Sequence, residues 1–224
     1  MLLRLRPALT LVGVAATLAL VSGCGSADDW SRPHARPSAV GTLAEGFTDP
    51  ASPPRPESTI TPRPGSWDGV HPSEDYRVVL LTAGDDEATG TLVDAVRRWA
   101  DDEEVSLKTV TATDPHHYVD KIDRAIKMAP DLIVTAGNDL VDPLAMVSAS
   151  HLDQPFLVVG AELAEPTHNV TAADWTGASF RGEGLGASST YDPASFTAER
   201  AMDAVRAGVA AVLSGVTGIV IWLD

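Results

Sequence analysis

Two short loops contain the residues whose types and spacing best suit ligand binding. Gly84-Asp85-Asp86-Glu87 follows the apolar run 76–83, and Gly137-Asn138-Asp139 follows the apolar run 131–136. The carboxylates of the first loop can accept hydrogen bonds from a ribose diol or another polyhydroxyl ligand. The amide of the second loop both donates and accepts, which suits the edge of a nucleobase. These two loops are therefore the first candidates for a binding site.

A third stretch, 177–183, adds an aromatic ring and a guanidinium group. Phe180 can stack on a base, and Arg181 can pair with a carboxylate through two parallel hydrogen bonds. The alternative for the acidic residues is helix capping, and the alternative for Phe180 is a place in the core. The predicted ligand-binding residues are Asp85, Asp86, Gly137, Asn138, Asp139, Phe180 and Arg181.

The segments that must position these loops alternate between strand and helix patterns. Helical spacing predicts helices between the strands, three of them starting at Asp-Pro pairs and the longest running from Asp192-Pro193 to Ser214. This alternation predicts an α/β fold with a doubly wound, mostly parallel sheet, a single Rossmann-like or flavodoxin-like lobe. Ligands bind such sheets where the strand order reverses, at the carboxyl ends of the strands, which places the two loops together. Apolar runs predict the strands at 76–83, 105–112, 131–136, 154–160, within 169–181, and at 218–224.

The last of these runs, Gly218 to Asp224, is too apolar to be left in water. Two arrangements would cover it. Either the strand joins the edge of the sheet, or it forms an interface with a partner.

The first 24 residues have the pattern of a bacterial export signal. Arg4 and Arg6 form a short positive region, and residues 8–21 are almost wholly apolar. This run is shorter than the about 20 apolar residues of a spanning helix and suits the core of a signal peptide. Val21-Ser22-Gly23-Cys24 resembles a lipobox, which implies a lipid on Cys24 that anchors the protein on the extracytoplasmic side of the cell membrane. The alternative is an ordinary signal peptide that happens to contain a cysteine.

Residues 25–75 have the composition of a spacer. They contain nine of the 16 prolines and show no sustained periodicity. Pro-rich sequence of this kind favours extended polyproline II, which predicts a disordered, semi-rigid tether. Trp30 and Trp67 either dock on the domain or are stray aromatics in the linker. The predicted organisation is a signal peptide at 1–23, a lipid-anchored tether at 24–75 and one α/β lobe at 76–224.

The composition excludes several classes of function. With 31 acidic residues against 16 Lys and Arg, and a net charge of −15, the chain lacks the basic surface that binds nucleic acid. A single cysteine excludes an internal disulfide and a Cys-based zinc cluster. His116 and His117 are adjacent, so on a helix they point about 100° apart and cannot share one metal. Because no catalytic motif is present either, we expect no enzyme activity, no catalytic residues, no metal and no cofactor.

Three stretches of the lobe resemble the basic membrane protein (BMP) family of solute-binding lipoproteins. They are Thr82 to Asp86, Pro130 to Asn138, and Gly177 to Glu183, which precedes a long helix as in that family. The resemblance implies one lobe, the N-terminal one, of a type I periplasmic-binding fold, in a family that commonly binds nucleosides for ABC importers. One departure is Glu87-Ala88-Thr89-Gly90, which stands where the family supplies an aromatic ring and an amide.

Two functions from different classes remain open. In the first, the chain is a solute-binding lipoprotein that recognises a nucleoside or similar polar small molecule and works with an ABC permease. In the second, it is a scaffold or interaction lipoprotein that has lost ligand binding. A single lobe encloses less of a ligand than two lobes do, so a homodimer in which a second copy replaces the missing lobe would reconcile the two.

Overall fold

A seven-stranded sheet, in which every neighbouring pair is parallel, organises the chain. The computed structural model describes residues 29–34 and 37–223. The strand order is β2-β9-β8-β7-β6-β4-β5, and it confirms the predicted α/β fold with a doubly wound parallel sheet. The strands are β2 (Thr59–Ile60), β4 (Arg77–Ala83), β5 (Ser106–Ala112), β6 (Leu132–Ala136), β7 (Phe156–Val159), β8 (Val170–Trp175) and β9 (Val220–Leu223).

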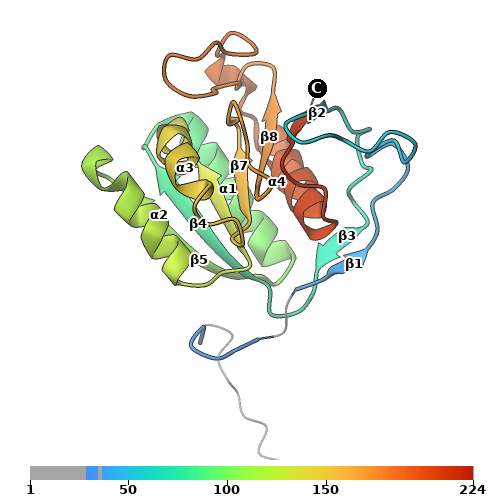
Figure 1. The fold of residues 1–224 in the computed structure, drawn as a ribbon, viewed down its shortest axis with the longest axis horizontal. Coiled ribbons are helices and arrows are strands. Elements are labelled where there is room, and N and C mark those ends of the chain that lie inside the picture. The colour runs from blue at the N-terminus through green and yellow to red at the C-terminus, as the bar shows by residue number, and fades with distance from the viewer. Residues whose placement is uncertain (1–28, 35–36, 224) are drawn as a thin grey trace, which may run out of the picture.

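Helices cover both faces of this sheet. Figure 1 shows α1 (Glu87–Asp102) and α4 (Ala198–Leu213) on one face, and α2 (Tyr118–Lys127) and α3 (Val141–Ser148) on the other. Successive side chains of a strand point to opposite faces, so the β4 residues alternate between two core clusters. One cluster contains residues of α1 and α4 and alternate β4 residues such as Leu80. The other contains residues of α2 and α3 and the intervening β4 residues. Burial on both faces explains the continuous apolar run of this strand.

The longest helix begins later in the structure than the sequence predicts. The pair Asp192-Pro193 begins a short 3-10 turn, η3 (Pro193–Ser195), and the long helix α4 begins later, at Ala198, capped by Thr197. The interruption is at Phe196, whose φ of −81° and ψ of 69° are not helical. The buried ring of Phe196 packs edge-on against Trp175 at 5.1 Å between centroids, so a tertiary contact overrides the local signal.

The other two 3-10 turns precede helices in the same way. In η1 (Pro115–His117), the side chain of Asp114 accepts a hydrogen bond from the His116 N–H, and α2 follows directly. In η2 (Asn138–Leu140), the turn follows β6 and leads into α3, which begins at Val141, just before the predicted Asp-Pro pair.

The proline-rich segment is not an extended spacer where the structure describes it. Within 37–75, β1 (Ala39–Gly41) pairs antiparallel with β3 (Val70–Pro72), and β2 pairs parallel with β9. Phe47 and Trp67 are 2% and 3% exposed and belong to the core cluster of α1 and α4. The prediction of a disordered tether is therefore wrong for this segment, because contacts distant in sequence order it.

Pairing with β2 also decides the position of the last strand. β9 lies between β2 and β8 in the sheet, so both of its edges are hydrogen-bonded. Of the two arrangements that would cover this apolar strand, the structure has the one within the sheet.

The residues just after the predicted anchor also dock on the domain. Trp30 Nε1 donates to Ser106 Oγ at 2.8 Å, and His34 Nε2 lies 2.8 Å from an Asp131 carboxylate oxygen. The Arg77 guanidinium donates to the Trp30 carbonyl oxygen. These contacts lie at the amino ends of β4, β5 and β6. The predicted signal peptide and its lipidation site, Cys24, lie outside the described residues. Over 29–34 and 37–223, no helix combines the length and the apolar character that crossing a bilayer requires.

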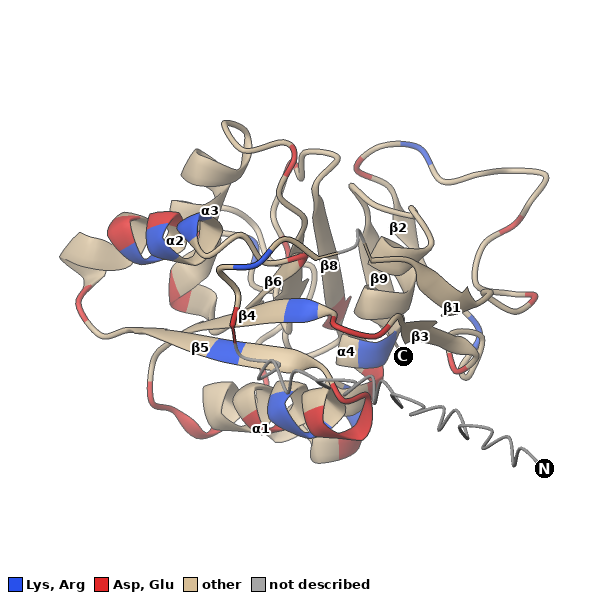
Figure 2. Ribbon diagram, turned by 90° about the horizontal axis from the view of Figure 1, so that it is seen from below, with Lys and Arg blue, Asp and Glu red and all other residues tan. Residues whose placement is uncertain are grey.

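Charged residues concentrate on the helices and the turns between elements. Figure 2 shows Lys and Arg interspersed with Asp and Glu along α1 and α2, while the strands are mostly uncharged. This distribution follows from the fold, because the outer faces of the helices are solvated and the strands are covered on both sides.

Candidate functional site

A small cavity lies at the point where the strand order reverses. The chain passes from β4 outward to β5 and then returns to β6 on the other side of β4. The loops after β4 and β6 are therefore neighbours that lead to helices on opposite faces of the sheet. The cavity has a volume of about 140 Å³. It is lined by Ala83, Asp86, Ala88, Thr89, Leu92, Gly137, Asn138, Asp139, Tyr191 and Phe196. The topology thus brings together the two loops that the sequence selects.

Asp86 both caps α1 and borders the cavity. Its Oδ1 accepts from the Thr89 N–H at 3.0 Å, and its Oδ2 accepts from Thr89 Oγ1 at 2.7 Å. Burial opposes ionisation of this carboxyl, but the hydrogen bonds from Thr89 and from nearby backbone N–H groups together outweigh it and hold the pKa of Asp86 below its usual range. Asp86 is therefore a carboxylate at neutral pH, with lone pairs left over for a ligand hydroxyl.

The second loop presents an amide and another carboxylate. Asn138 is half-buried, and its side chain forms no hydrogen bond with residues 29–34 or 37–223. Asp139 Oδ2 accepts a hydrogen bond from the Tyr118 hydroxyl at 3.1 Å. Burial and this hydrogen bond raise the pKa of Tyr118. The loop therefore offers the ligand an amide from Asn138 and the remaining lone pairs of Asp139.

Gly137 allows the two loops to approach each other. Its φ is +111°, and a Cβ added there would lie 2.3 Å from the Ala83 carbonyl oxygen. We expect Gly137→Ala to lower the free energy of unfolding by about 1–3 kcal/mol for the unfavourable backbone alone, and by more from the clash. Chemical denaturation would measure this loss.

Gly90 provides the matched control for that substitution. It lies within α1, and an added Cβ would meet nothing within 4 Å. Gly90→Ala is expected to raise the free energy of unfolding by about 1 kcal/mol, because alanine is the better helix former. Equal effects of the two substitutions would contradict the close approach described for Gly137.

Three predicted binding residues are not in the cavity. Asp85 is exposed beside it and does not line it. Phe180 is half-buried against the core cluster of α2 and α3, as the core alternative expects. Arg181 forms an ion pair with Glu162, at 3.2 Å between Nε and Oε1. The structure therefore brings together four of the seven predicted residues: Asp86, Gly137, Asn138 and Asp139.

Two aromatic residues that the sequence analysis did not select as binding residues complete the cavity. Tyr191 and Phe196 come from the long connection between β8 and α4, and their ring centroids are 5.8 Å apart. Burial and the neighbouring Asp86 carboxylate raise the pKa of Tyr191. Tyr191 is nevertheless 49% exposed, so part of its ring is available to stack on a planar ligand. No periodic pattern in this connection could have identified them.

A pair of buried carboxyl groups lies under the same connection. Glu162 and Asp174 are 5% and 0% exposed, and Glu162 accepts a hydrogen bond from Ser188 Oγ. Asp174 Oδ1 accepts from the N–H groups of Trp175 and Ser179, at 2.9 and 3.0 Å. Burial, with a smaller contribution from the neighbouring Glu162, raises the pKa of Asp174 to about 7 against the effect of these hydrogen bonds.

Comparison with known proteins finds remote likenesses. No protein-family profile and no curated protein matches the chain. A solute-binding protein of an ABC transporter system from Aeropyrum pernix K1 is 20% identical with a TM-score of 0.41, over 45% of this chain and 29% of that one. A fragment from Peptoclostridium difficile 630, named as a lipoprotein, is 16% identical with a TM-score of 0.44, over 63% and 99%. A periplasmic ribose ABC transporter protein from Conexibacter woesei DSM 14684 is 17% identical with a TM-score of 0.34, over 66% and 54%.

The matched part therefore spans less than two thirds of the Aeropyrum and Conexibacter proteins. Because these identities and TM-scores are low, the fold of this chain is assigned from its own strand order and pairing. Within residues 29–34 and 37–223, no group of three or more His, Cys, Asp or Glu side chains is placed to hold a metal ion. The cavity thus offers hydrogen-bonding groups and aromatic rings, which suit reversible binding of a polar molecule.

Proposed function

We propose that this chain is a membrane-anchored, extracytoplasmic solute-binding lipoprotein of the BMP type, which recognises a nucleoside or a similar polar small molecule for an ABC importer. The observation that supports it is the cavity at the reversal of strand order, where Asp86, Asn138 and Tyr191 converge. Asp86 would accept hydrogen bonds from a ribose diol, and Asn138 would pair with the edge of the base. The exposed ring of Tyr191 would stack on the base.

The size of the cavity implies that a nucleoside would be enclosed on one side. Its volume of about 140 Å³ is below the about 300–1,000 Å³ of sites that enclose a whole drug-sized ligand. The rest of the ligand would project from the carboxyl edge of the sheet. A second surface, from the permease or from a second copy of this chain, would then cover it.

A lipid on Cys24 fits this arrangement. Trp30, six residues further along the chain, docks at the amino ends of the strands, opposite the cavity at their carboxyl ends. Six residues span at most about 20 Å. An anchor on Cys24 would therefore hold the amino edge of the sheet near the membrane and direct the cavity away from it.

The alternative is a scaffold lipoprotein that has lost ligand binding. Its specific support is that several predicted binding groups already have partners within the chain. Thr89 occupies both carboxylate oxygens of Asp86, and Glu162 pairs with Arg181. Under this alternative the carboxyl edge of the sheet would contact another protein.

A thermal-shift screen of the purified protein with nucleosides, bases and sugars at millimolar concentration distinguishes the two. A ligand in hundredfold excess over its Kd stabilises the folded state by about 2.7 kcal/mol, which raises Tm measurably. We expect a shift with nucleosides that is lost in Asn138→Ala. Asp85→Ala should have a smaller effect, because Asp85 lies outside the cavity.

The control is Asp94→Ala, at an exposed position of α1 that does not line the cavity. It should leave the nucleoside shift unchanged. The absence of a shift with every compound, in a protein that melts cooperatively, would rule out the solute-binding proposal and favour the scaffold.

A further inference from the structure

The cavity at the reversal of strand order contains negative charge without a positive charge beside it. Asp86 and Asp139 both line it, and no lysine, arginine or histidine of the described ranges does. Neither carboxylate belongs to an ion pair within residues 29–34 and 37–223. By contrast, the buried Glu162 has Arg181 at 3.2 Å. The two carboxylates of the cavity are therefore free to pair with a positive charge that a ligand brings.

The side chains that line this cavity offer mostly hydrogen-bond acceptors. Asp86 and Asp139 are carboxylates, which accept only. Thr89 already gives its hydroxyl proton to Asp86 Oδ2 at 2.7 Å, so its remaining lone pairs also accept. Among the lining side chains, the Asn138 amide and the Tyr191 hydroxyl are left to donate. A ligand group that brings several donors therefore satisfies more of this cavity than a group that brings acceptors.

Two aromatic rings share the cavity with these carboxylates. The ring centroids of Tyr191 and Phe196 are 5.8 Å apart, and Tyr191 is half-exposed. Burial, and then the Asp86 carboxylate, raise the pKa of Tyr191, so the two side chains lie within electrostatic reach of each other. The face of an aromatic ring attracts a cation, as a carboxylate does. The ring of Tyr191 and the carboxylate of Asp86 thus favour the same kind of ligand group.

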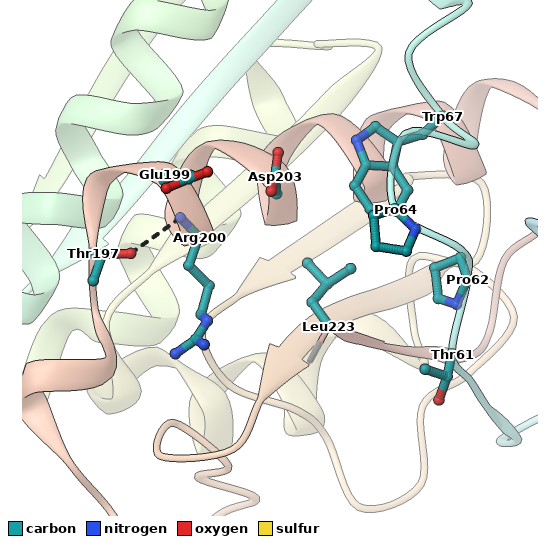
Figure 3. A pocket seen from close by; sticks show the side chains of 9 residues that line it. All are labelled: Thr61, Pro62, Pro64, Trp67, Thr197, Glu199, Arg200, Asp203 and Leu223. Carbon is teal, nitrogen blue, oxygen red and sulfur yellow. Dashed lines mark hydrogen bonds between the residues drawn. The ribbon is translucent and has the colours of Figure 1, made fainter.

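The larger cavity at the start of α4 differs in this respect. Its volume is about 260 Å³, and Figure 3 shows Glu199, Arg200 and Asp203 of α4 among the residues that line it. Its acidic side chains thus share the cavity with a guanidinium group, one nitrogen of which donates to the Ser195 carbonyl oxygen at 3.2 Å. A positively charged ligand group would meet a like charge there, whereas it meets none at the reversal of strand order.

We propose that the solute bound at the reversal of strand order carries a protonated primary amine, which donates to the Asp86 carboxylate and lies against the ring of Tyr191. An ammonium group has three donors and no acceptor, which matches the groups of this cavity. The volume of about 140 Å³ encloses one end of a ligand, and the amine is that end. The inference rests on the proposed solute-binding function and narrows its ligands to amine-bearing nucleosides and amino sugars.

The test compares compounds that differ in charge. One series is adenosine, its analogue with an amine in place of the primary hydroxyl, and adenosine monophosphate. The other is glucose, glucosamine and glucuronate. Each compound is titrated into the purified protein at about 150 mM salt, where exposed charges more than about 8 Å apart are largely screened, and Kd is obtained from the rise in Tm. In at least one series we expect the amine to bind about fivefold more tightly than the neutral compound, the upper end for an exposed ion pair, and the anion to bind most weakly.

Three charge-matched substitutions locate the amine. Asp86→Asn removes the charge, and because asparagine caps helices as well as aspartate does, α1 should still begin at the same residue. This variant should lose the preference for the amine over the neutral compound. Asp94→Asn changes the net charge equally at a side chain that is 81% exposed, and Asp203→Asn does so in the larger cavity. Both should keep the preference of the parent protein.

A second pair of substitutions tests the aromatic contact. Tyr191→Phe keeps the ring and removes the hydroxyl, whereas Tyr191→Leu removes both. The preference for the amine should survive in Tyr191→Phe and weaken in Tyr191→Leu, because only the ring attracts the cation through its face. An equal loss in the two variants would overturn the contact between the amine and the ring.

Three further results would overturn the inference. Equal binding of the amine and the neutral compound would do so while leaving the proposed solute-binding function in place. A preference that survives Asp86→Asn, or that falls as much in Asp94→Asn or Asp203→Asn, would mean that general charge attraction or the larger cavity holds the amine. The absence of a response to every compound, in a protein that melts cooperatively, would overturn the proposed function as well.

Discussion

Replacing Phe47 with alanine should lower the free energy of unfolding by about 3–5 kcal/mol, the usual cost of removing a buried phenylalanine ring. Phe47 is 2% exposed and belongs to the same core cluster as α1 and α4, although it lies in the proline-rich segment. Truncation would leave a void next to these helices that the surrounding backbone cannot close fully. Urea denaturation, followed by circular dichroism, measures the change through a lower midpoint with an unchanged slope.

Val40 provides the matched control in the same segment. It lies on β1 and is 53% exposed, so Val40→Ala should change the free energy of unfolding by no more than about 0.5 kcal/mol. If Phe47→Ala were as mild as Val40→Ala, the segment 37–75 would not be part of the folding unit. A large loss of stability in Phe47→Ala but not in Val40→Ala would mean that any stable fragment of this protein must include the segment 37–75.

The strands of the sheet were predictable because their pattern is local. A strand buried on both faces must be apolar at every position, and runs such as 76–83 and 131–136 have no other simple explanation. Their order along the chain, with helices between, restricts the topology to a parallel sheet with crossovers. The positions of the loops after β4 and β6 then follow from the topology, which is why Asp86 and Asn138 were found together.

The role of the proline-rich segment was not predictable from local pattern. Its ordering depends on the pairing of Thr59 with Val220, two residues that are 161 positions apart in the sequence. Phe47 and Trp67 are isolated aromatics without a helical or strand period around them. A spacing argument assigns no partner to such residues, so composition alone suggested a spacer.

The part of the site that comes from the connection between β8 and α4 could not be predicted from the sequence. Its course depends on Gly177 and Gly182, which have φ values of +104° and +125°, and on the Asp142 carboxylate, which accepts from the Glu183 N–H. These features place Tyr191 in the cavity and Arg181 beside Glu162. A sequence comparison of short motifs does not contain that information, because each contact joins residues from different elements.

The second large effect concerns Asp174 and the dependence of stability on pH. The pKa of Asp174 is about 7 in the folded protein, against 3.8 as its ordinary value, because the carboxyl is buried. The folded state therefore keeps this proton to a higher pH than the unfolded state does. The stability associated with the group is fully present below about pH 4 and is lost as the pH rises to about 7. A shift of this size corresponds to a loss of about 4 kcal/mol.

Asp174→Asn removes the titration and should flatten this dependence. The amide oxygen can still accept from the Trp175 and Ser179 N–H groups, while the amide nitrogen takes the place of Oδ2, which has no hydrogen-bond partner. The difference in free energy of unfolding between variant and parent should therefore move in favour of the variant by about 4 kcal/mol between pH 4 and pH 8.

Asp94→Asn is the control for this series, because that side chain is 81% exposed. Its curve should run parallel to that of the parent protein over the same range. If Asp174→Asn also ran parallel, Asp174 would not be the group that titrates in this pH range. If the stability curves of Asp174→Asn and the parent protein instead converge as the pH falls, Asp174 stays protonated up to neutral pH. The connection between β8 and α4, which forms one wall of the cavity at the strand reversal, then lies over a protonated carboxyl group. Ligand binding in that cavity would then weaken above pH 7, because the connection that positions Tyr191 would lose stability there.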